Sequence, residues 1–427
     1  MKILFVSMPH PTHFHPMLPL AWALRAAGHE VRVAGHPDLN DTATGGGMTV
    51  VPVGNTEWYR NDPYEPELYG QLMDRGASDY LRTFDWGWTD PEAWSWQGLL
   101  GLEKILVSSL LAGISNDPFI DDLIAYARHW QPDLVIWEQL TLAGAVVGEA
   151  LGVPHARFLY GLDFIGRARQ EFLRLYGRQH PEHREDPTRE WLEETVRRFG
   201  GAWTERLRVG GFTIATSVPG TELDVDGRTI DMRYVPYNGR CVVPDWLRVP
   251  AERRRVCLTL GMSNEIANTA TTSGEILGAL ADLDVQVVVT LAADEAARMG
   301  PLPQNVRAAG FVPLHDLLPT CSAIVHHGGF GSRLTSAYHG VPQLILGHGY
   351  DTLMAGQRQE KLGAGLCLPA DNATPEAIRE CVVRLLDEPA LAAGAARIRA
   401  DLLAQPSPAE VVPMLERIVA EFAGAVR

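Results

Sequence analysis

Short apolar runs and amphipathic segments alternate along the first part of the chain. Residues 2–8 and 31–34 are rich in aliphatic and β-branched side chains and predict strands, whereas the apolar positions of residues 17–27 recur with a helical period. Gly28 follows the helical segment, at the place of a helix C-cap. A strand, a helix and a second strand in this order form a βαβ unit, which implies a parallel sheet.

The same alternation returns in two later stretches. A strand at residues 133–137, a helix over about 141–151 and a strand at 155–159 extend the first series. A second series of predicted strands lies at residues 255–261, 285–291, 306–312, 323–327 and 343–346. Two such series predict an α/β protein of two doubly wound, Rossmann-like domains facing across a cleft, with ligands beyond the carboxyl ends of the strands.

Length and charge agree with two globular domains and narrow the choice of partner. A chain of 427 residues is too long for one ordinary core, and 46% hydrophobic with 21% charged residues is typical of globular proteins. The net charge of -15 argues against nucleic acid or an anionic membrane as a partner, but leaves room for one small anion held by local donors. No apolar stretch approaches the roughly 18 residues of a membrane span.

Cysteines and acidic motifs give no sign of a disulfide framework or a metal site. The five cysteines are scattered without CxxC spacing, and we expect a cytoplasmic location. The N-terminal apolar run meets His10 and prolines before any cleavage signature, which predicts a first strand rather than a signal peptide. Two Asp-x-Asp patterns, at residues 224–226 and 282–284, do not follow predicted strands, and we interpret them as surface turns.

A glycine-rich turn stands out in the second series. Residues 326–332, HHGGFGS, place two histidines, three glycines and a serine where the predicted strand at 323–327 ends. A helix is expected from Ser332 to about His339, so its free N–H groups and the positive end of its dipole suit a phosphate. Glycines that only relieve crowding are the alternative interpretation. The pattern is not GxGxxG, which disfavours a dinucleotide-dependent oxidoreductase.

Three histidines, His10, His13 and His15, crowd the loop after the first predicted strand. A neutral imidazole can accept a proton from a hydroxyl near neutral pH, which makes any of them a candidate base. A histidine in a loop is, taken alone, more often a surface or capping residue.

In their order along the chain, these motifs resemble the GT-B glycosyltransferases of family 1. The agreement lies at residues 12–16, 260–263, 311–314, 327–332, 340–342 and at Asp351. Residues 18–24 and 232–239 are most similar to actinobacterial antibiotic glycosyltransferases of the desosaminyltransferase type, which attach deoxysugars to polyketide aglycones. The resemblance covers nearly the whole chain and implies the GT-B fold.

For the sugar donor, the resemblance implies a diphosphate clamp of side chains and backbone N–H groups. Its members would be His327, Gly328, Gly329, Gly331, Ser332 and Ser263. Phe311 would stack on the nucleobase, and the backbone of Val312 would bind the base edge. Such donors stabilise the charge that grows on the leaving nucleotide, so neither a metal nor another cofactor is expected.

Two departures from the family pattern narrow the donor. Thr335 stands where relatives that bind ribose have a glutamate, which favours the 2′-deoxyribose of a dTDP-sugar. Asp351 and Thr352 stand where many glucose users have Asp-Gln, and the loss of the glutamine suits a sugar with fewer hydroxyls. Asp351 would bind a sugar hydroxyl or pair with an amino group.

On the acceptor side, the resemblance gives His13 the place of the base. Glu138 follows a predicted strand where relatives commonly have aspartate, and it would orient His13; the alternative is that it lies near the N-terminus of the next helix. Residues 56–126 are aromatic and acidic and predict an insertion of helices and loops, which suits an apolar aglycone or a packed core. The candidate acceptor residues in it are Trp58, Trp86 and Trp88.

Together these features predict an inverting glycosyltransferase that moves a deoxysugar or aminodeoxysugar from dTDP to a hydroxyl of a macrolide or aromatic polyketide. We expect an acceptor-binding domain, a linker region, a nucleotide-sugar-binding domain and a C-terminal helix that crosses back, at residues 1–216, 217–250, 251–405 and 406–427. The resemblance also implies a cytochrome-P450-like auxiliary activator protein, and a homodimer is left open. A nucleotide-sugar 2-epimerase and a non-catalytic binding or activator protein of this fold are the alternatives.

Overall fold

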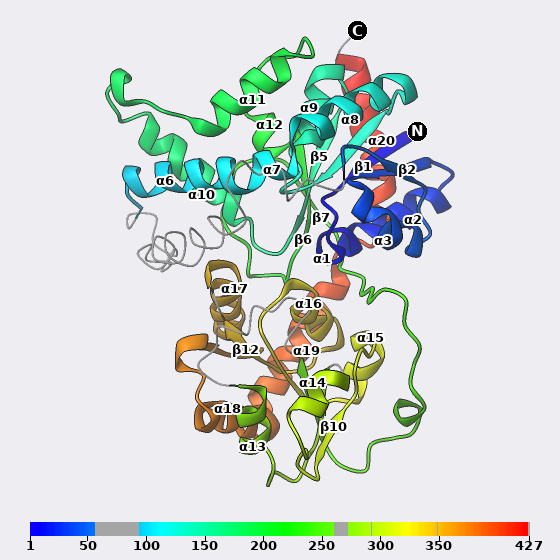
Figure 1. The fold of residues 1–427 in the computed structure, drawn as a ribbon, viewed down its shortest axis with the longest axis vertical. Helices are drawn as coiled ribbons and strands as arrows, with labels where there is room; N and C mark the ends of the chain where they lie inside the picture. The colour runs from blue at the N-terminus through cyan, green and yellow to red at the C-terminus, as the bar shows by residue number, and fades with distance from the viewer. Residues whose placement is uncertain (56–93, 260–271, 292, 348, 426–427) are drawn as a thin grey trace. The chain divides into compact units, whose positions relative to one another are not determined.

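Two compact units make up the chain, and each contains its own sheet (Figure 1). Unit 1 comprises residues 1–216, 223–232 and 406–427, and unit 2 comprises residues 217–222 and 233–405. The computed structural model describes residues 1–55, 94–259, 272–291, 293–347 and 349–425.

Unit 1 is built on a parallel sheet whose described strands lie in the order β3-β2-β1-β4-β5-β6-β7. The strands are β1 (Lys2–Val6), β2 (Glu30–Gly35), β3 (Val50–Pro52), β4 (Leu134–Glu138), β5 (His155–Tyr160), β6 (Phe212–Thr216) and β7 (Thr229–Asp231). The helices are α1 (Pro11–Phe14), α2 (Leu18–Ala26), α3 (Asn40–Gly45), α6 (Trp96–Leu106), α7 (Ala112–Ile114), α8 (Asp117–Trp130), α9 (Ala143–Leu151), α10 (Phe164–Tyr176), α11 (Pro187–Arg197), α12 (Arg206–Val209) and α20 (Pro408–Ala425). Every residue of β4 is buried, as expected of a central strand in a sheet covered by helices.

Unit 2 has a second parallel sheet, with its described strands in the order β10-β9-β8-β11-β12-β13. The strands are β8 (Arg255–Thr259), β9 (Gln286–Val289), β10 (Val306–Ala308), β11 (Ala323–His326), β12 (Gln343–Gly347) and β13 (Gly365–Pro369). The helices are α13 (Ser273–Ala279), α14 (Ala293–Arg298), α15 (Leu314–Leu317), α16 (Phe330–His339), α17 (Gly349–Lys361), α18 (Pro375–Asp387) and α19 (Pro389–Ala404). The two parallel sheets confirm the predicted fold class.

Helix α20 belongs to unit 1, although α19, the helix before it, belongs to unit 2. It packs against α2, and Figure 1 shows the red α20 beside the blue α2. Just beyond the end of α2, Nε2 of His29 lies 3.0 Å from Oε1 of Glu416 in α20. Among the described residues, no helix has the length and the low charge that a membrane-spanning helix needs.

The segment expected as a linker, residues 217–250, is divided between the two units. Residues 223–232 belong to unit 1 because β7 adds to the edge of its sheet, with Ile230 opposite Ile214 of β6. Three strand residues, of which only Ile230 is buried, are too few for an alternating pattern to reveal.

The predicted insertion is helical where the structure describes it. Residues 94–126 contain α6, α7 and the first part of α8, in agreement with the predicted helices. Phe119, Leu123 and Ile124 of α8 pack into the same apolar core as Val135 of β4. Residues 56–93, with Trp58, Trp86 and Trp88, lie outside the described residues.

Close packing around Gly394 gives a test of the fold of unit 2. A Cβ atom added to Gly394, in α19, would lie 1.9 Å from the carbonyl oxygen of Gly363, whereas one added to Gly424, in α20, meets no described atom within 4 Å. Because backbone cannot move aside as a flexible side chain can, Gly394→Ala should lower the free energy of unfolding by about 1–3 kcal/mol. The control Gly424→Ala should leave it unchanged or raise it by less than about 1 kcal/mol. Urea unfolding measures both, and equal effects of the two variants would contradict the packing of α19.

Candidate active site

Neighbouring strand ends of unit 1 bring the predicted base and its partner to one edge of the sheet. β1 pairs with β4 so that Val6 lies opposite Trp137, and β4 pairs with β5 so that Glu138 lies opposite Phe158. Parallel strands end on the same side of a sheet, so the segment after β1 meets the last residues of β4 and β5. His13 lies in α1, directly after β1.

His13 and Glu138, predicted as a catalytic pair, are in hydrogen-bond contact. Nδ1 of His13 lies 3.0 Å from Oε1 of Glu138, which has 0% exposed surface. The hydroxyl of Thr141 donates to Oε2 of Glu138 at 3.0 Å, and the hydroxyl of Tyr160 donates to Oε1 at 3.1 Å and also contacts Nδ1 of His13. A buried carboxylate requires such donors to stay ionised. The site therefore holds four side chains, of which Tyr160 and Thr141 were not predicted.

Of the three histidines after β1, His13 is the one in contact with Glu138. His10 accepts a hydrogen bond from the backbone N–H of Thr12 and thereby caps α1. Burial and the neighbouring His10 lower the pKa of His15 to about 4, so the imidazole of His15 is neutral at physiological pH. The capping contact gives His10 a local structural role.

In unit 2, the glycine-rich turn connects β11 to α16, and the helix begins at Phe330, earlier than predicted. In the described part of the chain no side chain caps α16, so the N–H groups of its first turn point away from the helix at the positive end of its dipole. A Cβ atom added to Gly331 would meet no described atom within 4 Å, whereas one on Gly329 would lie 2.2 Å from Nε2 of His327. The imidazole of His327 thus lies against the backbone at the start of the helix.

Gly328 allows the turn to approach α17 closely. It has a φ of 92°, a conformation that strains other residues, and an added Cβ would lie 2.8 Å from Cβ of Thr352. Thr352, predicted at the donor sugar, is 7% exposed and packs under this turn. Crowding and backbone conformation therefore both require glycine at position 328.

His326 fixes the shape of the turn and was not predicted as a site residue. It is fully buried, its Nδ1 accepts from the N–H of Gly328 at 3.0 Å, and its Nε2 lies 2.8 Å from Oε1 of Gln343. Because Nδ1 accepts, Nε2 carries the proton and donates to Gln343. Burial lowers the pKa of His326 to about 3, which keeps this ring neutral. Gln343 also donates to the carbonyl of Arg333 at 3.5 Å and so links the turn to α16.

The residues expected at the nucleobase differ in exposure. Phe311 is 60% exposed, unusual for a large apolar side chain, whereas Val312 is 4% exposed. Thr335 is fully buried, and its hydroxyl donates to the carbonyl of Gly331 at 2.6 Å and lies 3.3 Å from the hydroxyl of Tyr234. The hydrogen bond to Gly331 ties the buried side chain of Thr335 to the first turn of α16. The expected contact of Thr335 with the deoxyribose stays a prediction.

Two further predicted site residues are not placed. Ser263, expected at the diphosphate, lies outside the described residues. The side chain of Asp351 is not described either, although its backbone belongs to the first turn of α17. Their roles stay predictions.

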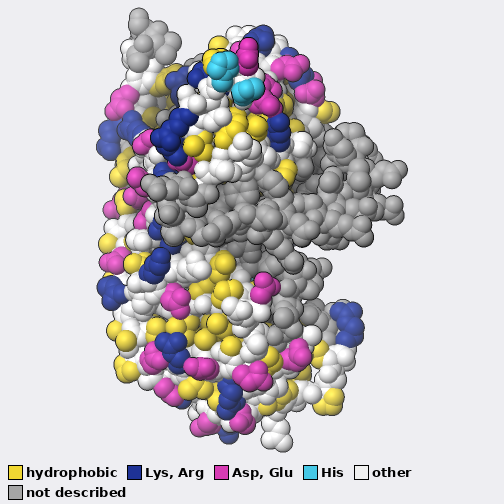
Figure 2. All heavy atoms as spheres, turned by 90° about the vertical axis from the view of Figure 1, so that its left-hand side faces the viewer, with side chains coloured by type: hydrophobic (Ala, Val, Ile, Leu, Met, Phe, Trp, Pro, Cys, Tyr) yellow, Lys and Arg dark blue, Asp and Glu magenta, His cyan; other side chains and the backbone are white. Residues whose placement is uncertain are grey.

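Metal-ligating clusters and basic areas were sought among the described side chains. No group of three or more metal-ligating side chains occurs among the described residues. In one Asp-x-Asp pattern, Asp282 pairs with Arg379, and Asp284 lies 3.5 Å from Arg253. Figure 2 shows acidic and basic side chains interspersed on the visible described surface, without a continuous basic area.

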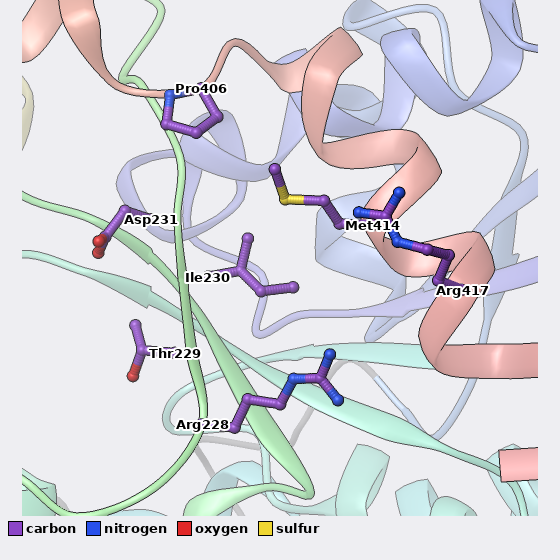
Figure 3. A pocket seen from close by; sticks show the side chains of 7 residues that line it. All are labelled: Arg228, Thr229, Ile230, Asp231, Pro406, Met414 and Arg417. Atoms are coloured by element: carbon purple, nitrogen blue, oxygen red, sulfur yellow. The ribbon is translucent and has the colours of Figure 1, made fainter. Parts of the chain in front are cut away.

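A hollow of about 340 Å³ lies on unit 1 between the edge strand β7 and α20 (Figure 3). It is lined by Arg228, Thr229, Ile230, Asp231, Pro406, Met414 and Arg417. None of the predicted site residues lines it, and Arg228 is paired with Glu421 at 3.4 Å. We assign it no part in the candidate site.

Comparison with known proteins gives one consistent family. The family model described as Erythromycin biosynthesis protein CIII-like, N-terminal domain, matches residues 22–261, and the corresponding C-terminal domain matches residues 274–418. The chain is 46% identical to the 3-alpha-mycarosylerythronolide B desosaminyl transferase of Saccharopolyspora erythraea, over 98% of this chain and 99% of that protein. It is 45% identical to the 10-deoxymethynolide desosaminyltransferase of Streptomyces venezuelae, over 99% and 98% of the two chains.

A solved structure extends the comparison to the fold. The crystal structure of the glycosyltransferase VinC in complex with dTDP matches with a TM-score of 0.87 and 38% identity, and the match covers 99% of this chain and 100% of that one.

The buried ring of His326 predicts a specific dependence of stability on pH. His326→Leu leaves the N–H of Gly328 and the amide of Gln343 without their partner, so the free energy of unfolding at pH 7 should fall by about 2–4 kcal/mol. The native ring has a pKa of about 3 and the unfolded ring one near 6.5, so the unfolded state binds more protons between these values. Wild-type stability therefore falls as pH drops below 6.5, and this contribution is absent from the variant.

Urea unfolding at pH 7 and pH 5 measures this effect, and the gap between wild type and His326→Leu should narrow at pH 5. His129, exposed on α8, provides the control, because His129→Leu should change stability at either pH by less than about 0.5 kcal/mol. A gap of equal size at both pH values would contradict a buried neutral His326.

Proposed function

Since the chain belongs to the Erythromycin biosynthesis protein CIII-like family of glycosyltransferases and has the GT-B fold, we propose that it transfers a deoxysugar from dTDP to a hydroxyl of a polyketide-type aglycone in antibiotic biosynthesis. The observation that carries this proposal within the chain is the contact of His13 with the buried carboxylate of Glu138. A non-catalytic relative has no need of an imidazole held by a buried carboxylate. No contact among the described residues favours the 2-epimerase.

On the donor side, the start of α16 binds the diphosphate. Its uncapped N–H groups, the imidazole of His327 and the open space at Gly331 offer donors and room for a doubly charged group. The exposed ring of Phe311 stacks on thymine, and Ser332 and Ser263 add hydroxyl donors. These residues bind the leaving group through N–H and O–H donors, and no metal takes part in this scheme.

On the acceptor side, His13 acts as general base. With Nδ1–H directed at Glu138, Nε2 has the lone pair that takes the proton of the acceptor hydroxyl. The oxygen then attacks the anomeric carbon, the bond from that carbon to the β-phosphate oxygen breaks, and its electron pair leaves with dTDP. The carboxylate of Glu138 stabilises the imidazolium that forms. One displacement of this kind inverts the anomeric configuration.

The names of the relatives bear on the sugar, the acceptor and the partners. Both named relatives are desosaminyltransferases, and the name of the second gives 10-deoxymethynolide as its acceptor. By this similarity we propose a related aminodeoxysugar as the donor, with Asp351 and Thr352 at the sugar and Trp58, Trp86 and Trp88 at the aglycone. A P450-like auxiliary protein belongs to the same proposal, and its addition should raise turnover.

Calorimetry tests the donor site directly. Wild-type protein should bind dTDP more tightly than UDP, because the site accepts a 2′-deoxyribose and a thymine methyl. His327→Ala removes one donor to the diphosphate and should weaken dTDP binding by about tenfold or more. His129→Ala is the matched control and should bind dTDP like wild type. Equal affinity for dTDP and UDP, or a His327 variant with unchanged affinity, would contradict the donor assignment.

Loss of the base should separate chemistry from donor binding. His13→Gln keeps a hydrogen-bonding side chain but removes the basic nitrogen, so kcat for transfer should fall by about 10²–10⁴-fold. Its affinity for dTDP should stay within about twofold of wild type, because the diphosphate residues belong to unit 2. Transfer is measured by chromatography of the glycosylated aglycone, with His129→Gln as control. Full activity of His13→Gln would exclude His13 as the base.

A further inference from the structure

Tyr160 completes a triangle of polar atoms with the two predicted catalytic side chains. Its hydroxyl lies 3.1 Å from Oε1 of Glu138 and also contacts Nδ1 of His13, while these two atoms lie 3.0 Å apart. The ring of Tyr160 meets the ring of His13 edge to face, with centroids 5.1 Å apart and planes at 82°. One phenol therefore contacts both the base and its carboxylate.

The position of Tyr160 follows from the register of the sheet. Phe158 of β5 lies opposite Glu138 of β4, and Tyr160 is two residues further along the same strand. Residues two apart in a strand point to the same side, so the ring of Tyr160 lies beyond Phe158 at the carboxyl edge. Being the last residue of a central strand, it has a backbone fixed by pairing with Thr216 of β6.

The three contacts allow one arrangement of protons when Glu138 is ionised. If Nδ1 of His13 had a lone pair, that lone pair would face a carboxylate oxygen at 3.0 Å, which is repulsive. Nδ1 therefore carries a proton, shared between the phenol oxygen and Oε1 of Glu138, and the hydroxyl of Tyr160 donates its own proton to Oε1. This arrangement leaves the lone pair of His13 on Nε2, as a general base requires.

The hydroxyl of Tyr160 also bears on the charge of Glu138. Within the described residues, this buried carboxylate has polar contacts with His13, Tyr160 and Thr141. Tyr160 and Thr141 are neutral donors that stabilise the ionised carboxylate before His13 is protonated. Among the described residues, His10 also faces His13, with ring centroids 5.6 Å apart.

We propose that Tyr160 is a positioning residue for the transfer reaction, which holds His13 in the Nδ1–H tautomer and helps keep Glu138 ionised. This inference rests on the proposed function, in which His13 is the base. The phenol acts through His13 and Glu138 and does not touch the reacting atoms.

Tyr160→Phe removes the hydroxyl and keeps the ring. Without the phenol oxygen, His13 loses one of the two acceptors for Nδ1–H, so kcat should fall about tenfold while KM for both substrates stays within about twofold. Nδ1–H of His13 keeps Oε1 of Glu138 as an acceptor, whereas the carboxylate loses the phenol as a donor and becomes more basic, so the His13–Glu138 pair binds a proton more tightly. The acid limb of the pH profile of kcat should therefore move to higher pH. If the ring of Tyr160 only filled space, Tyr160→Phe would change neither kcat nor the position of the acid limb.

Two further variants isolate the effect. Thr141→Val removes the donor to Oε2 without touching His13, so it should move the acid limb in the same direction with a smaller fall in kcat. Tyr126→Phe removes another phenol of unit 1, hydrogen-bonded to Arg32 at 2.7 Å, and should leave kcat and the pH profile at wild-type values. Thermal melting of all variants reports whether each is folded.

The outcomes separate this inference from the function on which it depends. The inference is overturned if folded Tyr160→Phe keeps wild-type kcat, or if its acid limb stays in place or moves to lower pH, while His13→Gln is inactive. If His13→Gln is itself fully active, the assignment of the base fails, and the role of Tyr160 fails with it. A tenfold lower kcat with a raised acid limb supports it.

Discussion

The parallel direction of the strands is the constraint on which the candidate residues of each unit depend. In unit 1, β1, β4 and β5 are neighbours, so the chain that follows β1 reaches Glu138 and Tyr160 at one edge. In unit 2, β11 lies between β8 and β12, and the glycine-rich turn leaves the sheet at the same kind of edge. The sheets hold these ends rigidly, because their central strands are buried and paired on both sides.

Buried polar groups convert these strand ends into defined geometry. Glu138 and His326 are both fully buried, and each is satisfied by specific partners. In unit 1, Thr141 and Tyr160 donate to Glu138, which contacts Nδ1 of His13. In unit 2, His326 holds the N–H of Gly328 and thereby shapes the turn before α16. Such groups cost more to leave unpaired than they contribute when paired, so they resist alternative arrangements and preorganise the site.

The fold and part of the site could be predicted from patterns along the chain. Apolar runs located most central strands, because buried parallel strands are continuously apolar, and the motifs around His13 and His327 indicated the family. The short strand β7 was not predicted, because three residues with one buried side chain are too few to show an alternating pattern. Tyr160 was not predicted as a site residue, because an aromatic residue at the end of an apolar strand is expected in a core. Its contacts with His13 and Glu138 depend on the register between segments that are distant in the sequence. His326 was not predicted for the same reason, since it also ends an apolar strand. The hydroxyl of Thr141 matters because Glu138 is buried, which the sequence does not show.

The proposed chemistry has one displacement at the anomeric carbon, with the proton of the acceptor passing to His13 as dTDP leaves. Attack from the side opposite the leaving group inverts the configuration, whereas a glycosyl-enzyme intermediate would require two displacements and retain it. The most direct test compares the anomeric configuration of the product with that of the dTDP-sugar supplied. NMR gives this configuration from the one-bond carbon–proton coupling and the three-bond proton–proton coupling at the anomeric position. Inversion is the expected result, and a product that retains the donor configuration would contradict direct attack by a hydroxyl activated by His13.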